Sequence, residues 1–127
     1  MKPIIGEWMN FAMSDLMAAE QLSGNRNLTT IACFHSQQCV EKCLKAIIEL
    51  KGIIPPKIHD LIRLYEIANE PFEIEEDMLA RLNELYIESR YPPGLGLFPD
   101  GPPTTEESKI FFEFAKKIYH STSEITG

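Results

Sequence analysis

The sequence predicts an all-α protein, an antiparallel up-and-down helical bundle of four long helices plus one short helix. Apolar residues recur at spacings of three and four along most of the chain, as they do on one face of a helix. No stretch alternates apolar and polar residues between turn residues, which is the pattern of a strand. Most of the connections are short, and short connections place consecutive helices side by side in opposite directions.

The length and charge of the chain limit the functions that it can serve. Its 127 residues, of which 44% are apolar and 24% charged, suit a single globular domain spanning residues 1–127. The net charge of −7 repels phosphate backbones, so contact with nucleic acid would need a local basic patch. A signal peptide and a long apolar run are both missing, which predicts a cytoplasmic protein with no membrane contact.

The first helix is expected over residues 4–23, with Gly24 as its stop signal. Asp15 falls within the apolar row of this helix and should therefore seek a partner inside the bundle. A buried ion pair with a lysine or arginine, for example Arg90, is the structural interpretation. A carboxylate at a functional site is the alternative.

The longest helix is expected over residues 28–51, with Asn27 as a candidate N-cap and Gly52 at its end. Two adjacent apolar stripes predict that it packs against more than one neighbour, with its three cysteines present as free thiols. The remaining face is polar and should be exposed to water or meet a partner. It carries His35, Gln38, Glu41, Lys42, Lys45 and Glu49, of which Glu41 and Lys45 form an i,i+4 pair.

A short third helix from His59 to Ala68 follows the Pro55-Pro56 break, and a fourth helix follows over residues 75–90. At the start of the third helix, Asp60 should complement the helix dipole and His59 should help to satisfy the free backbone groups. Structural capping is therefore the predicted role of both residues.

A loop is expected over residues 91–103, because this stretch holds five of the nine prolines and three of the seven glycines. Leu95, Leu97 and Phe98 could pin it to the surface. Thr104 with Glu107 forms a capping-box pattern, which opens a last helix that runs to about Ser121.

Common catalytic signatures are missing from the sequence, which has no P-loop, GxGxxG, HExxH or nucleophile elbow. His35 could serve as a base or a ligand, but its neighbours Gln38 and Lys42 are not metal ligands at a useful spacing. We expect no bound metal and no cofactor.

Three segments together resemble the HEPN domain family. They are ACFHSQQCVEKCLKAIIELKG at residues 32–52, the following KIHDL, and LYIESRYP at residues 85–92. The resemblance extends over nearly the whole chain and points to the RYP subgroup, which is associated with nucleotidyltransferases. It implies a bundle of four or five helices, commonly a homodimer, often encoded beside a minimal nucleotidyltransferase as a toxin and antitoxin pair.

The resemblance also implies an active site that this chain lacks. Many relatives are RNases with an arginine followed four to six residues later by a histidine, whereas residues 91–104 after Arg90 contain no histidine. Losing the group that moves the proton removes roughly 100- to 10,000-fold in rate. The expected function is thus a binding and assembly module without enzymatic activity, which partners a nucleotidyltransferase and accepts a nucleotide or RNA end.

The expected anion contact is Arg90, whose guanidinium would hold a phosphate, with Tyr91, Lys42, Lys45 and His35 as the other candidate ligand-binding residues. Charge is segregated along the chain: residues 41–63 carry a net +2 and residues 66–90 a net −6. The alternative is a metal-independent RNase that combines Arg90 with a different base, such as His59 or His120.

Overall fold

The computed structural model describes residues 2–89 and 101–127 and forms five helices: α1 (Pro3–Leu22), α2 (Thr29–Leu50), α3 (Leu61–Ile67), α4 (Glu76–Ser89) and α5 (Thr105–Thr126). These ranges contain no strand. The predicted all-α bundle of four long helices and one short helix is thereby confirmed. Most of the predicted loop, with Leu95, Leu97 and Phe98, lies outside the described residues.

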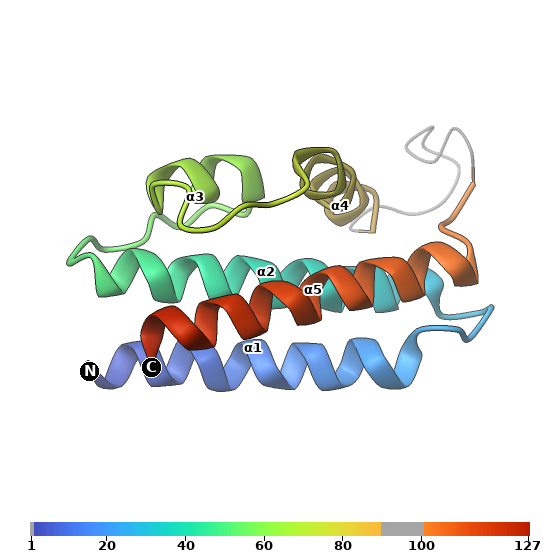
Figure 1. The fold of residues 1–127 in the computed structure, drawn as a ribbon. Coiled ribbons are helices and arrows are strands. Elements are labelled where there is room, and N and C mark those ends of the chain that lie inside the picture. The colour runs from blue at the N-terminus through green and yellow to red at the C-terminus, as the bar shows by residue number, and fades with distance from the viewer. Residues whose placement is uncertain (1, 90–100) are drawn as a thin grey trace.

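Two layers of helices make up the fold (Figure 1). The lower layer contains α1, α2 and α5, in which α2 runs antiparallel to α1 while α5 runs in the same direction as α2 (Figure 1). The upper layer contains α3 and α4, and α4 crosses the long helices steeply (Figure 1). Helix α2 packs against each of the four other helices, which explains why its sequence needs two apolar stripes.

The core draws side chains from all five helices, and α2 contributes the largest share. Fully buried examples are Ile5, Leu44, Ile47, Leu64, Leu82 and Ala115. All three cysteines are free and buried on α2, as the sequence predicts. None of the described helices is both long enough and apolar enough to cross a bilayer.

Several helix ends follow local sequence signals. Gly24 and Gly52 adopt positive φ values of 87° and 80° just after α1 and α2, a conformation that glycine favours. Thr104 and Glu107 form the predicted capping box of α5. The prediction for Asn27 is wrong: Leu28 occupies the N-cap position of α2, and the Asn27 amide instead donates to Asn25 Oδ1 at 2.9 Å.

Helix α5 extends to Thr126, five residues beyond the expected end near Ser121. Thr122 is fully buried and its hydroxyl donates to the carbonyl of Ile118 at 2.8 Å. Thr126 repeats this contact with the carbonyl of Thr122 at 3.0 Å. Both hydroxyl groups are satisfied within the helix, and burial of Thr122 against the bundle keeps this segment of serine and threonine residues helical.

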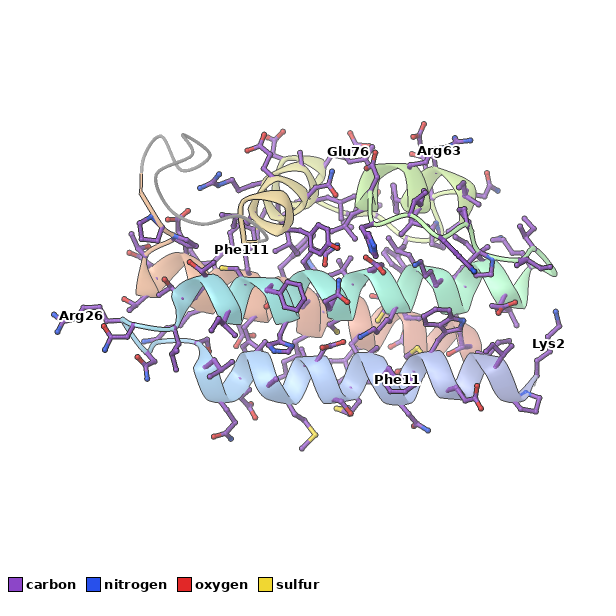
Figure 2. The ribbon with its side chains drawn as sticks, turned by 180° about the vertical axis from the view of Figure 1, so that it is seen from behind. Lys2, Phe11, Arg26, Arg63, Glu76 and Phe111 are labelled. Carbon is purple, nitrogen blue, oxygen red and sulfur yellow. The ribbon has the colours of Figure 1, made fainter. Side chains whose placement is uncertain are left out.

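The polar face of α2, expected to be exposed to water or to meet a partner, is in part covered by the rest of the chain. Glu41 is 4% exposed and Lys45 is 6% exposed. Side chains fill the space between α1 and α2 and the space between α2 and the α3 and α4 layer (Figure 2). Burial of this face brings charged groups from distant parts of the sequence together.

Candidate functional site

Asp15 on α1 is the centre of the first polar cluster, where it bridges two side chains of α2. Asp15 Oδ1 lies 2.9 Å from His35 Nδ1, and Lys42 Nζ donates to Asp15 Oδ2. Asp15 is 8% exposed, so these contacts compensate for the loss of water around its charge. The described partners of Asp15 are thus a lysine and a histidine of α2, while Arg90 lies outside the described residues.

Glu41 on α2 is the centre of a second cluster. It accepts from Lys45 Nζ at 3.1 Å and lies 2.9 Å from His59 Nδ1, with Gln37 Nε2 at 3.3 Å. Gln37 Nε2 also donates to the carbonyl of His59 at 3.2 Å, which ties the chain before α3 to α2. Gln38 Nε2 donates to Gln37 Oε1 at 2.7 Å and completes this cluster.

The two histidines share one geometry, because a carboxylate faces Nδ1 of each imidazole. A carboxylate only accepts, so this contact places the proton of the neutral ring on Nδ1 and leaves the lone pair on Nε2. The side chain of His35 is 28% exposed and that of His59 is 49% exposed. In each pair the carboxylate therefore orients the imidazole, whose Nε2 can accept a proton or hydrogen-bond a ligand.

Aromatic rings connect the two clusters on the same side of the molecule. Phe34 contacts His35 edge to face at 5.4 Å and stacks on Tyr86 of α4 at 5.9 Å. Tyr86 in turn lies 5.1 Å from the ring of His59. The rings form a continuous row from one histidine to the other, which connects the two clusters through aromatic side chains.

The two candidate lysines are engaged inside the fold. Lys45 is buried, forms its ion pair with Glu41, and places Nζ 5.6 Å from the centre of the Trp8 ring. Lys42 has a side chain that is 20% exposed, and its Nζ lies 5.8 Å from the centre of the exposed Phe11 ring. Lys45 is therefore buried with its carboxylate partner, whereas Lys42 and His35 are partly exposed.

Of the two residues before α3 that were expected to cap it, only Asp60 does so. The Asp60 side chain accepts from the backbone amides of Ile62 and Arg63 and is the N-cap of α3. His59 does not cap this helix, because its imidazole turns toward Glu41 of α2. Tyr91 and Arg90 both lie outside the described residues.

Sequence reasoning missed the contacts of three buried residues in this region. Glu41 was assigned only a pair with Lys45, and Gln37 and Tyr86 were given no polar role. The residues Gln37, Glu41 and Lys45 follow at intervals of four, which indicates a polar stripe but not the histidine that meets it. His59 lies 18 positions after Glu41, so local spacing could not have found this contact.

The described residues were compared with what a metal site and a reactive cysteine need. In residues 2–89 and 101–127, no three His, Cys, Asp or Glu side chains gather closely enough to hold a metal ion. Burial, together with the negative charge of Glu107, raises the pKa of Cys33 to about 12. A hydrogen bond with Cys43 and burial raise the pKa of Cys39 well above its usual value. Both thiols therefore stay protonated and poorly reactive at neutral pH.

Comparison with known proteins gives a family and a fold. The sequence profile of the HEPN domain matches residues 5–125. The crystal structure of TT1696 from Thermus thermophilus shares 26% sequence identity and a TM-score of 0.77, covering 97% of this chain and 98% of that one. The structure of ST0689, an archaeal HEPN homologue, shares 23% identity and a TM-score of 0.69 over 100% of both chains.

A search of curated proteins finds no significant match. The family profile nevertheless extends over nearly the full chain, and the helices of both structural relatives superpose on this bundle. The chain belongs to the HEPN domain family.

Proposed function

We propose that this chain is a non-catalytic HEPN-type binding and assembly module of the RYP subgroup. It pairs with a minimal nucleotidyltransferase in a toxin–antitoxin-like system, acts as a homodimer, and accepts a nucleotide or RNA end next to Arg90 and Tyr91. HEPN domains commonly function in nucleotide- or RNA-related processes and commonly dimerise, which supports this proposal at the level of the family.

The observation that carries the proposal is the internal pairing of the lysines on α2. Lys42 is bound to Asp15 and Lys45 to Glu41, so each lysine already has a carboxylate partner within the fold. A phosphate would have to displace a carboxylate to reach either one. Asp15 has two described partners, His35 and Lys42, and the proposal gives Arg90 the role of an anion ligand.

The lack of a histidine shortly after Arg90 supports binding over cleavage. Residues 91–104 contain no histidine, although the arginine that can neutralise a phosphate is present. Charge neutralisation alone holds an anion, whereas cleavage of RNA also needs a group that moves the proton of the 2′-hydroxyl. The expected activity is therefore retention of a ligand or partner without turnover.

A titration with ATP tests the ligand half of the proposal. The Arg90→Ala variant should lose at least about tenfold in affinity, since a charge-assisted contact contributes roughly 1.5 to 3 kcal/mol. Arg63→Ala, which removes an exposed arginine from α3, is the matched control and should bind as the wild type does. Equal affinity of wild type and Arg90→Ala would contradict the assignment of Arg90.

Co-expression tests the assembly half. A small nucleotidyltransferase encoded beside this chain should co-purify with it in a fixed ratio. Failure of the two purified proteins to form a complex would contradict the pairing. Light scattering of the chain alone should give about twice its 14.5 kDa mass.

A second candidate function, a metal-independent RNase, is favoured by the pairing of His59 with Glu41. A carboxylate on Nδ1 orients the imidazole as a general base, and the side chain of His59 is 49% exposed. Structured RNA incubated in EDTA separates the two functions. Cleavage that is lost in both Arg90→Ala and His59→Ala but persists in His120→Ala would contradict the binding module and support the RNase.

A further inference from the structure

A groove of about 750 Å³ opens between the α3–α4 region and α5. Its walls come from α3, from the segment that joins α3 to α4, from the first turn of α4, and from residues 114–121 of α5. Apolar rings and branched side chains form its floor, including Phe72, Ile74, Phe114 and Ile118. A smaller groove of about 450 Å³ shares Phe114 and continues it along α5 to the exposed Ile110.

The rim of this groove is acidic. Glu73, Glu75, Glu76 and Asp77 line one edge, with Lys117 as the basic residue among the lining side chains. In the described part of the chain, none of these four carboxylates forms an ion pair. Burial, followed by the charges of Glu70, Glu76 and Glu73, raises the pKa of Tyr65 in the groove, so the field there is negative.

A segment with the complementary character lies at one end of the same molecule. The connection between α2 and α3 projects beyond the bundle (Figure 1) and carries Ile53 and Ile54, which are 44% and 87% exposed. Lys51 and Lys57 flank these isoleucines and are exposed, and no acidic residue lies between the two lysines. We name residues 51–57 the basic tip.

The contacts within one chain do not account for the exposed apolar side chains of the basic tip. Ile54 is the most exposed of the large apolar side chains in the described residues, and its neighbours Pro55 and Pro56 hold the backbone in a restricted conformation. An apolar, rigid and positively charged projection loses little entropy when it is buried against a partner. An apolar floor with an acidic rim offers the surface that such a projection needs.

We propose that the basic tip of one copy inserts into the acidic groove of a second copy, and that a reciprocal pair of these contacts forms the homodimer. Ile53 and Ile54 pack on the apolar floor while Lys51 and Lys57 face the rim carboxylates. Each copy contributes one tip and one groove, as a closed twofold pair requires. This inference specifies the interface of the homodimer in the proposed function and depends on that self-association.

Light scattering of single variants gives the first test. Ile54→Asp places a carboxylate among the rim carboxylates and on the apolar floor, and the dissociation constant of the dimer should rise at least about tenfold. Ile31→Asp is the matched control, because Ile31 is 48% exposed at the opposite end of α2. A dimer that survives Ile54→Asp overturns this interface while leaving the homodimer intact, whereas a monomeric wild type overturns both.

A charge exchange gives the second test and does not depend on an apolar residue. The variant Lys51→Glu with Lys57→Glu has an acidic tip and an acidic groove, while Glu73→Lys with Glu75→Lys has a basic tip and a basic groove. Each should be monomeric alone, with helical content and unfolding like the wild type. Mixed in equal amounts, they should form a dimer, because both contacts then join opposite charges.

The mixture distinguishes the reciprocal pair from other arrangements. A mass that stops at two chains as the concentration rises supports the closed pair. Variants that stay dimeric alone, a mixture that stays monomeric, or a mass that keeps growing with concentration would each overturn it.

Discussion

Replacing Glu41 with glutamine removes one charge from a buried site and keeps the shape of the side chain. Lys45 then remains in the bundle with its Nζ near a neutral amide, and the side chains of the pair are only 8% and 5% exposed. Breaking a buried ion pair by removing one partner costs about 3 to 5 kcal/mol. The Trp8 ring lies 5.6 Å from Nζ before and after the change, so its contact with the ammonium group does not alter the difference. The expected loss in the free energy of unfolding is therefore about 3 to 5 kcal/mol.

Urea unfolding followed by helical circular dichroism measures this loss, with an unchanged slope against denaturant as the sign that the folded state is intact. Glu84→Gln is the control, because its pair with Arg81 at 3.5 Å is largely exposed and should change stability by less than about 0.5 kcal/mol.

The double variant Glu41→Gln with Lys45→Met tests the cause of the loss. Methionine removes the unpaired charge while it keeps the packing against Trp8, so the double variant should be more stable than Glu41→Gln alone. A double variant as unstable as the single one, or a loss below about 1 kcal/mol for Glu41→Gln, would refute the reasoning that an unpaired buried lysine causes the effect.

Three further substitutions test local features of the fold. Thr104→Ala removes the cap of α5, in which Thr104 Oγ1 accepts from the Glu107 amide at 3.0 Å, and should cost about 1 kcal/mol in a thermal melt. Gly24→Ala should cost about 1 to 2 kcal/mol, because φ is 87° there and a new Cβ would lie 2.8 Å from Lys109 Cε; an unchanged melt would contradict the strain. The pKa of Cys33 rises from 9.0 to about 12, since burial and Glu107 disfavour the thiolate. Its contribution to stability is complete below pH 9 and is lost as the pH rises toward 12, so Cys33→Ala should flatten the decline in stability above pH 9.

The sequence by itself determined the elements whose signals are local. Apolar spacing located all five helices to within a few residues, because a helix that packs on a core must repeat its apolar side chains every three to four positions. The stops at Gly24 and Gly52 and the capping box of Thr104 depend on backbone groups within one turn. Such features can be predicted from the sequence because the residues that form them are close together in the chain.

Only the tertiary structure decided which polar residues are buried and what they contact. The face of α2 that carries Glu41 and Lys45 has the composition of a solvated surface, but α1 and the segment before α3 cover it. His59 and Asp60 are neighbours in the chain, yet one reaches α2 while the other caps α3. Burial turns an ordinary i,i+4 pair into a charge cluster whose stability depends on every partner, because water no longer screens it. Periodicity predicts that a helix has a polar face, whereas the neighbouring helices determine whether that face meets solvent or protein.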